Sequence, residues 1–388
     1  ISNSCNMSLS PKNILFYLFL LGVVTWACVN PIKDFVQIDA TSFTTIEADI
    51  SDDPDLSKVR LTSSSNRLLS QLALPISKAV VFVTDQNGNK TPFTEGIPLG
   101  TYYPPTGWKG AVASTYKLNV KMLTGQTYES TAETMKAVPE IENAITRFET
   151  FEQYDKVDVR RAGFTVYLDF KDLPSEGDFY LWNWKHYEKI GFCATCTDGG
   201  KYDFKKLDCV QPKFPTDVIL NYMCDGNCWD ITSNNDLNVF SDVLTNGQRV
   251  VGRQVARIPF DNWTPYYFRL EQRSITKNAF AFYQSLISQV QSSGSLFDVP
   301  AETRFSLNIK SLTTPSERVL GIFNVFSVRK KIFIIDRRKN IPLGEEPIIS
   351  IIPGDTYSCP PGSVGCQDKA PCIESPTRTK ITPEGWVF

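Results

Sequence analysis

Histidine is almost absent from this chain of 388 residues, which contains only His186. A single imidazole excludes any His-rich metal site and leaves one candidate base for a Ser–His or Cys–His nucleophilic site. An excess of basic residues is also missing, since 40 Lys and Arg stand against 42 Asp and Glu. Binding to a phosphate backbone depends on such an excess, so we expect no nucleic-acid partner. The chain has no P-loop, Gly-rich dinucleotide motif, calcium loop or internal repeat, and we expect neither a cofactor nor a metal.

Long hydrophobic runs are missing as well, and the longest follows Lys12 and covers Ile14 to Ala27. This run is shorter than the ~20 residues of a membrane-spanning helix and fits the apolar region of an export signal. A small residue directly before a cysteine, Ala27-Cys28, is typical of a bacterial lipoprotein signal. The alternative is a plain secretory signal with an incidental cysteine. We predict a signal peptide over residues 1–27, lipidation of Cys28 and a protein held on a bilayer by its acyl chains.

Eight cysteines remain when Cys5 and Cys28 are set aside: Cys193, Cys196, Cys209, Cys224, Cys228, Cys359, Cys366 and Cys372. An even number in an exported chain predicts disulfides, and the close pairs in the first group make a zinc site the alternative. The first five form one group and the last three lie in the tail. Because both groups are odd, at least one disulfide should connect the tail to the first group if all eight pair within the chain.

Alternating polar and apolar residues predict that the chain is mainly β. The clearest example is STYKLNVKM at 114–122, and Asn87-Gly88 is typical of a hairpin turn. We predict an immunoglobulin-like β-sandwich over residues 28–138 and a second, sandwich-like β domain over 139–347. The second domain should include separate strands at 319–328 and 331–335. Residues 348–388 are rich in Pro and Gly and should form an extended tail, fixed by its cysteines and by Trp386.

One segment, residues 274–293, changes from strand-like to helical spacing of its apolar residues. Ser274 or Thr276 is placed to cap its start, and Gly294 is placed to end it. We predict an amphipathic helix that packs its apolar face against the second sheet.

Aromatic residues are concentrated in the strand FYLWNW at 179–184. Trp182, Trp184, Trp229 and Trp263 could stack on a sugar ligand, but packing in a β core is the favoured interpretation. His186 shares strand parity with Trp184, and we favour a hydrogen-bonded structural role for it over that of a base.

Four carboxylates lie close to this aromatic strand: Asp169, Asp172, Glu176 and Asp178. Two of them could serve a glycan hydrolase, which works through a pair of carboxyl groups. The surrounding KDLPSEGD is typical of a loop, so we favour solvated turn residues over catalysis and expect no enzyme activity.

The order of several motifs resembles a lipoprotein family of Bacteroidota that is known as domain of unknown function 4249. These motifs are CVNPI at the predicted lipidation site, IEADISDDPDLSKVRLTSS, FYLWNW, NGQRVVGRQVARIPF, SITKNAFAFYQSLISQVQSSGSLFDVPAE, VLGIFNVFSVRKKIFI and the terminal KITPEGWVF. The resemblance implies an outer-membrane lipoprotein, often associated with a TonB-dependent (SusC-like) transporter barrel. It implies no catalytic residues.

These observations together predict a lipid-anchored outer-membrane protein that faces the cell surface and takes part in nutrient uptake. It would be a non-catalytic capping or ligand-binding subunit of a TonB-dependent barrel. A surface adhesin or structural lipoprotein is the first alternative, and a carboxylate-based glycan hydrolase is the second.

Overall fold

The computed structural model describes residues 43–64, 73–152, 160–291, 305–347, 355–356 and 369–387 of the chain, and these belong to one unit. The predictions for residues 1–42, including Cys28, lie outside the described residues, as do Cys359, Cys366 and Gly294. The described part is mainly β, as predicted, with most strands joined in one large sheet. No helix among the described residues has the length and apolarity needed to cross a membrane.

The first half of the large sheet is formed by short antiparallel strands with one buried face. They are β1 (Thr44–Ser51), β2 (Lys58–Ser63), β3 (Leu74–Pro75), β4 (Val80–Asp85), β5 (Lys90–Glu95), β6 (Thr101–Tyr103), β7 (Thr115–Lys121), β8 (Thr127–Ser130) and β9 (Glu133–Thr134). In β7 the side chains of Tyr116, Leu118 and Val120 are buried in the core, which confirms the predicted alternation. The hairpin predicted at Asn87-Gly88 connects β4 to β5, and Gly88 has a φ of +83°.

A β-sandwich is built on the other half of the large sheet. Its strands here are β12 (Phe179–Lys189), β17 (Trp229–Ser233), β18 (Asn238–Ser241), β20 (Tyr266–Ile275) and β25 (Arg378–Thr379), with the short helix η1 (Asp242–Leu244) after β18. A separate three-stranded sheet covers one face and consists of β10 (Ile141–Glu152), β11 (Arg160–Lys171) and β19 (Arg249–Pro259). Phe164 and Leu168 of this sheet share a core with Trp182 and Phe268 of the large one.

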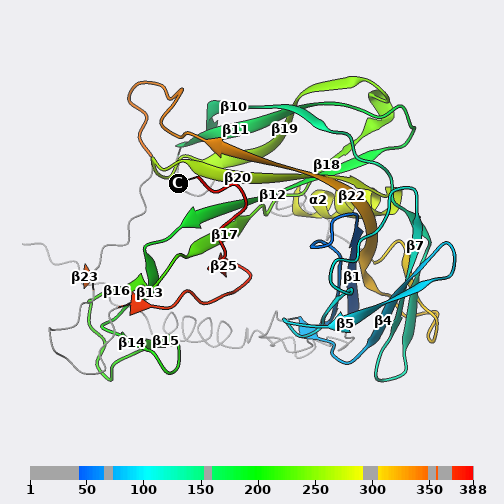
Figure 1. Ribbon diagram of the computed structural model, residues 1–388, viewed down its shortest axis with the longest axis horizontal. Helices are drawn as coiled ribbons and strands as arrows, with labels where there is room; N and C mark the ends of the chain where they lie inside the picture. Colours follow the sequence, from blue (N-terminus) through cyan, green and yellow to red (C-terminus); the bar gives the residue numbers. More distant parts are fainter. Residues whose placement is uncertain are drawn as a thin grey trace, which may run out of the picture. The chain divides into compact units, whose positions relative to one another are not determined.

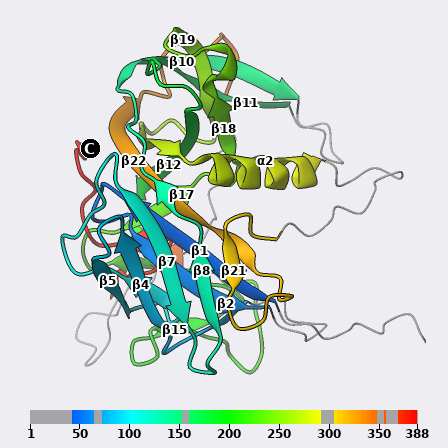
Figure 2. The same cartoon turned by 90° about the vertical axis from the view of Figure 1, so that its right-hand side faces the viewer.

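Strand β22 (Leu320–Ile335) connects the two halves of the large sheet. Its first half pairs in parallel with β1, and its second half pairs antiparallel with β20, so it is one strand where two were predicted. In Figure 1 it runs in orange from beside β1 to beside β20. The short strand β21 (Ile309–Ser311) pairs with β8 at the sheet edge, as Figure 2 shows. The sheet is thus continuous past residue 138, while the domain boundaries given above remain a prediction.

Helix α2 (Lys277–Gln291) is the one α-helix in the described part of the chain and confirms the helix predicted at 274–293. The hydroxyl of Thr276 accepts a hydrogen bond from the Ala279 N–H at 3.4 Å, so Thr276 caps its start. Ala279 and Phe282 pack with Phe326 of β22 on the sheet face opposite the three-stranded sheet. The helix therefore covers the large sheet near the junction of β1 and β22.

A small lobe rich in cysteine completes the described chain. It consists of β13 (Phe192–Cys196), β14 (Lys201–Asp203), β15 (Asp208–Val210), β16 (Leu220–Cys224), β23 (Asp355–Thr356) and β24 (Lys369–Ala370). Both β23 and β24 come from the tail and pair in parallel with β16, so the tail is attached to the lobe through its backbone.

Candidate functional site

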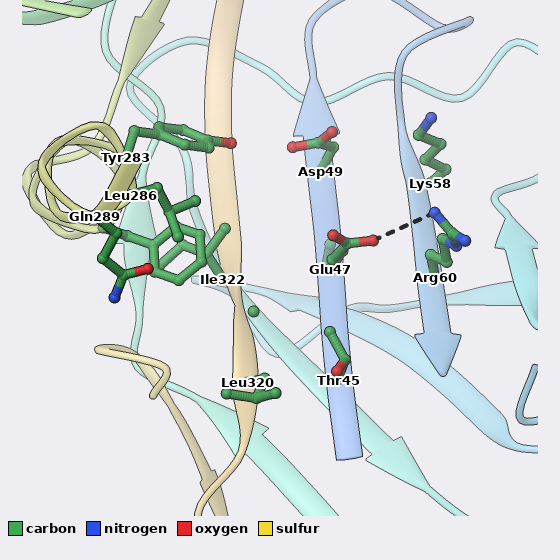
Figure 3. Close-up of a pocket in the computed structure, with 13 residues that line it drawn as sticks. Thr45, Glu47, Asp49, Lys58, Arg60, Tyr283, Leu286, Gln289, Leu320 and Ile322 are labelled. Atoms are coloured by element: carbon green, nitrogen blue, oxygen red, sulfur yellow. Dashed lines mark ion pairs between the residues drawn. The ribbon is translucent and has the colours of Figure 1, made fainter. Parts of the chain in front are cut away.

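A cavity of about 610 Å³ lies between helix α2 and the outer face of the first half of the large sheet. We call it the α2 groove (Figure 3). Its lining comes from four neighbouring elements: Phe282, Tyr283, Leu286 and Gln289 of α2, Leu320, Gly321 and Ile322 of β22, Thr45, Glu47, Ala48 and Asp49 of β1, and Lys58 and Arg60 of β2.

Strand alternation explains why charged side chains face this groove. In β1, the side chains of Ile46, Ala48 and Ile50 are buried in the core on one face of the sheet. Glu47 and Asp49 alternate with them and therefore project from the other face. The same alternation in β2 buries Val59 and Leu61 and turns Lys58 and Arg60 outward. The pairing of Glu47 with Arg60 across β1 and β2 places the two rows of charges side by side.

The carboxylates of the groove are only partly compensated by other groups. Glu47 forms an ion pair with Arg60 at 3.8 Å, and both side chains are exposed. Asp49 accepts a hydrogen bond from Asn324 Nδ2 at 3.3 Å. Burial raises the pKa of Asp49 above its ordinary value, although Arg273 and Lys58 act to lower it. The folded protein therefore keeps a half-buried carboxylate that is poorly stabilised in its charged form.

The helix side of the groove is apolar except for the Tyr283 hydroxyl and the Gln289 amide. Leu286 of α2 and Ile322 of β22 form the wall, and the Tyr283 hydroxyl points across the groove toward Asp49 in Figure 3. Burial raises the pKa of Tyr283, and the charge of Asp49 adds to this rise. Tyr283 therefore stays protonated and can act as a hydrogen-bond donor or acceptor at neutral pH.

A row of buried and half-buried charges continues from the groove along β20, on the same face of the sheet. Arg273 Nη2 donates to Glu271 Oε2 at 2.6 Å, and Arg269 Nη2 donates to Glu271 Oε1 at 3.4 Å. Burial acts to raise the pKa of Glu271, but Arg273 and Arg269 outweigh burial and hold it below the ordinary value. The guanidinium of Arg273 also lies over the Phe326 ring at 4.5 Å. These contacts fix a positive charge behind Asp49.

Glycine is required where β22 meets β1 beside the groove. Gly321 has a φ of +95°, and a Cβ at this position would lie 2.1 Å from the carbonyl oxygen of Ile46. A side chain therefore cannot be accommodated without separating β1 from β22. Gly321 sets the spacing between the two halves of the large sheet.

The tryptophans considered for ligand stacking are mostly core residues. Trp182 is fully buried and donates to Gln272 Oε1 at 2.9 Å, and Trp229 is 1% exposed with its ring against Trp386. Trp184 packs against Phe268, with 5.6 Å between ring centroids. Neither Trp182 nor Trp229 has a ring face open to a ligand, so core packing, the favoured interpretation, describes both.

Trp263 is more open than the other three, with 41% of its surface exposed, and it contacts Phe260 edge-on at 5.1 Å. It lies in the loop between β19 and β20 and does not line the α2 groove.

His186 is a buried, hydrogen-bonded residue of β12. Its Nδ1 lies 2.9 Å from the carbonyl oxygen of Tyr267, and its ring stacks on Tyr266 with 3.6 Å between centroids. Its Nε2 lies 3.4 Å from Glu188 Oε2, and this contact lowers the pKa of Glu188. The ring is held from both sides, in agreement with the structural role favoured for it.

Two of the four carboxylates near the aromatic strand are buried, so the interpretation of all four as solvated is wrong. Asp172 is 2% exposed and accepts hydrogen bonds from the Tyr180 hydroxyl and the Gly247 N–H. Asp178 is 0% exposed and pairs with Lys136 at 2.8 Å. Asp169 accepts from the Gly252 N–H at 2.8 Å, and Glu176 is exposed. Asp172 and Asp178 hold the loop after β11 in place through their contacts with Gly247 and Lys136, which are distant in the sequence.

Six of the eight predicted cysteines form three disulfides: Cys193–Cys224, Cys196–Cys209 and Cys228–Cys372. This confirms disulfide bonding for these six, and Cys228–Cys372 is the expected connection between tail and cluster. Among the described residues, Cys193, Cys228 and Cys372 have sulfur atoms within 4.8 Å of one another. All three sulfurs are engaged in disulfides, and a metal would require thiolates.

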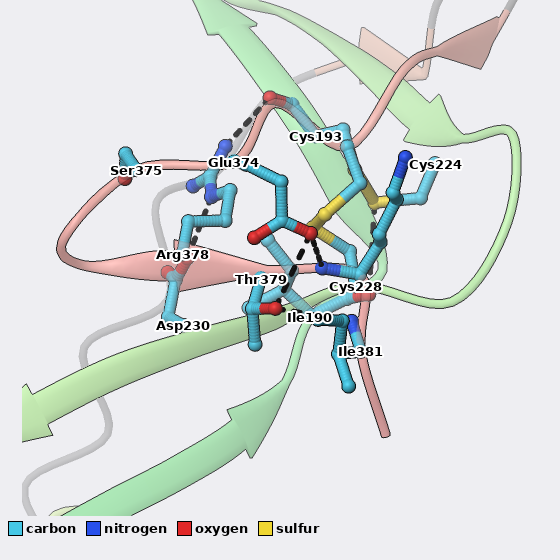
Figure 4. Close-up of a disulfide and its surroundings, with 12 residues drawn as sticks. Ile190, Cys193, Cys224, Cys228, Asp230, Glu374, Ser375, Arg378, Thr379 and Ile381 are labelled. Carbon is cyan, nitrogen blue, oxygen red and sulfur yellow. Dashed lines mark hydrogen bonds and ion pairs between the residues drawn. A yellow bond between two sulfur atoms is a disulfide. The ribbon is translucent and has the colours of Figure 1, made fainter. Parts of the chain in front are cut away.

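Polar contacts reinforce the attachment of the tail at the same place (Figure 4). Arg378 donates to Asp230 Oδ1 at 2.7 Å and to the Cys193 carbonyl oxygen at 2.9 Å. Farther along, the Tyr267 hydroxyl donates to the Glu384 carbonyl oxygen at 2.6 Å, and Trp386 packs against Tyr267. The described part of the tail is thus fixed by a disulfide and by Trp386, as predicted.

The groove residues were missed by sequence reasoning. The segment IEADISDDPDLSKVR contains all four of its charged residues, Glu47, Asp49, Lys58 and Arg60. A signal was present, because charged and apolar residues alternate at 46–50 and again at 58–61. Two such strands with opposite charges on their polar faces predict a charged sheet surface, but not the helix that covers it.

The fold and the groove define a mainly β protein with a disulfide-linked lobe and a charged groove beside its one described α-helix. Residues 32–332 match the model of the family described as Domain of unknown function (DUF4249), and the chain belongs to this family. No curated protein matches the sequence.

Proposed function

We propose that this protein is a lipid-anchored, non-catalytic subunit that binds a ligand at the mouth of a TonB-dependent outer-membrane transporter. The observation that carries the binding role is the α2 groove, whose volume of about 610 Å³ lies in the range of small-molecule sites. Its apolar wall and its few charged side chains are also the usual composition of such sites.

Two further features support an anchored position outside the cytoplasm. Three disulfides suit an oxidising compartment, and Ala27-Cys28 after a short apolar run suits a lipoprotein signal. The resemblance to outer-membrane lipoproteins of Bacteroidota supports the transporter as partner and the cell surface as location. We also propose an immunoglobulin-like sandwich for the first half of the large sheet, which its short antiparallel strands and single core support.

Affinity purification from detergent-solubilised outer membranes tests the proposal. The tagged protein should recover a large TonB-dependent barrel in near-stoichiometric amount. The Cys28→Ala variant is the matched control, because it should leave the membrane fraction and lose the barrel while keeping the described fold. Repeated recovery of the anchored protein without a barrel would contradict the proposed partnership.

A further inference from the structure

The α2 groove carries three kinds of side chain in parallel rows. Figure 3 shows their order across the groove, starting at the helix: first Leu286 and Ile322, then Glu47 and Asp49 of β1, and last the basic side chains of β2. The order follows from the sheet, in which β22, β1 and β2 are consecutive neighbours. A bound molecule lying across the strands would therefore meet hydrocarbon, negative charge and positive charge in that order.

The charges in these rows are equal in number and incompletely paired. Glu47 and Asp49 stand beside Lys58 and Arg60, and the one ion pair among these four has a separation of 3.8 Å. Within the described part of the chain, Asp49 has a hydrogen bond of 3.3 Å and the Tyr283 hydroxyl has no hydrogen-bond partner. Polar groups with unused capacity in a half-buried site can each accept a ligand group at little reorganisation cost.

We propose that the α2 groove binds a small zwitterion with a hydrocarbon side chain, such as an apolar α-amino acid or a short apolar peptide. The ammonium would bind Asp49, and the Tyr283 hydroxyl would accept a further hydrogen bond from it. The carboxylate would bind Lys58 at the edge of β2. The hydrocarbon would pack on Leu286 and Ile322. This assignment rests on the proposed function, since it specifies the ligand of the same binding site.

Charge balance selects this class over the other ligands that a groove of this size admits. A molecule with one charge would bind only one of Asp49 and Lys58, which lie outside the Glu47–Arg60 ion pair, and a neutral sugar would bring a countercharge to neither. The cavity of about 610 Å³ also has room for two or three residues of a peptide.

The charge of Asp49 does not stabilise the folded protein. The pKa of this residue is raised by burial, so the charged form is disfavoured in the folded protein relative to the unfolded chain. At a pH above its ordinary pKa, this group therefore lowers stability instead of adding to it. Asp49→Asn should therefore leave the melting temperature unchanged or higher, while it removes the charge that the ligand ammonium needs.

Isothermal titration calorimetry on the full chain in detergent at pH 7 tests the inference, with L-leucyl-L-leucine and L-leucine as probes. At least one should bind saturably at one site, and Asp49→Asn should weaken it at least tenfold without lowering the melting temperature. Glu129→Gln is the matched control, because Glu129 pairs with Lys117 at 2.7 Å on the strand pair β7–β8, away from the groove. It should leave the affinity unchanged.

Other probes supply the contrary outcomes. Hexylammonium, hexanoate or glucose binding as tightly as both zwitterions would overturn the inference, as would unchanged affinity in Asp49→Asn or no binding of either zwitterion. The proposed function is tested separately, by whether affinity purification of the anchored protein recovers a barrel. A barrel recovered by a protein that binds neither zwitterion would reject only the ligand class.

Discussion

Gly321→Ala should lower the free energy of unfolding by about 4 kcal/mol, at the upper end of single-substitution effects. The added Cβ would lie 2.1 Å from the carbonyl oxygen of Ile46 and 2.7 Å from its carbonyl carbon, both of which are backbone atoms. Neither atom can move without breaking the parallel pairing of β1 and β22. Urea denaturation followed by tryptophan fluorescence measures the loss.

Gly125→Ala is the matched control for this substitution. Gly125 has a φ of +94°, nearly that of Gly321, but a Cβ there would have nothing within 4 Å. It should cost about 1 kcal/mol, the penalty of the backbone conformation alone. Equal losses in the two variants would show that the close approach of β1 to β22 is not the reason for glycine at 321.

Removal of the Cys228–Cys372 disulfide should have the other large effect. The two cysteines are 144 residues apart. Closing a loop of this length lowers the entropy of the unfolded chain and stabilises the folded protein by about 5 kcal/mol. The double variant Cys228→Ser, Cys372→Ser should lose most of this amount. The tail should also become accessible to protease, because its remaining attachments near Arg378 are the short pairing of β25 with β17 and the two hydrogen bonds of the Arg378 side chain.

The Cys196–Cys209 disulfide provides the comparison, since its partners are 13 residues apart. Its removal by the corresponding double serine variant should cost about 3 kcal/mol. In denaturant titrations, the variant without Cys228–Cys372 should therefore lose about 2 kcal/mol more of its free energy of unfolding than the variant without Cys196–Cys209. The reverse order would mean that unfolded-state entropy is not the main contribution of the longer disulfide.

Local patterns in the sequence were sufficient for many elements of the fold. Helical spacing after Thr276 gave α2, and alternation gave strands such as β7. The parity of the cysteines gave the connection between tail and lobe, but the individual partners depend on which sulfurs the folded lobe brings together.

Features that depend on contacts between residues far apart in the chain could not be predicted from local sequence patterns. Residues 319–328 and 331–335 were predicted as two strands, and the residues between them are the charged Arg329 and Lys330. Both residues stay in register with β20, and Arg329 pairs with Glu140 while Lys330 pairs with Asp53 at 2.7 Å. Partners that are distant in the chain thus keep these charged positions within one strand.

The buried carboxylates illustrate the same limit. Asp172 and Asp178 lie in a segment with the composition of a loop, and their burial depends on Tyr180 and on Lys136, whose side chain also donates to the carbonyl oxygens of Glu176 and Gly177. The α2 groove is also non-local, since β1 and α2 are separated by more than half of the chain. Charge alternation marks the strand face, and only the folded sheet places it beside the helix.

Lipid anchorage at Cys28 is the claim on which the transporter role depends, and mass spectrometry of the mature protein tests it most directly. Intact-mass and N-terminal peptide analysis of protein taken from membranes should find the chain starting at Cys28 and carrying acyl chains. A mature protein with an unmodified amino end, or with residues 1–27 still attached, would contradict the account.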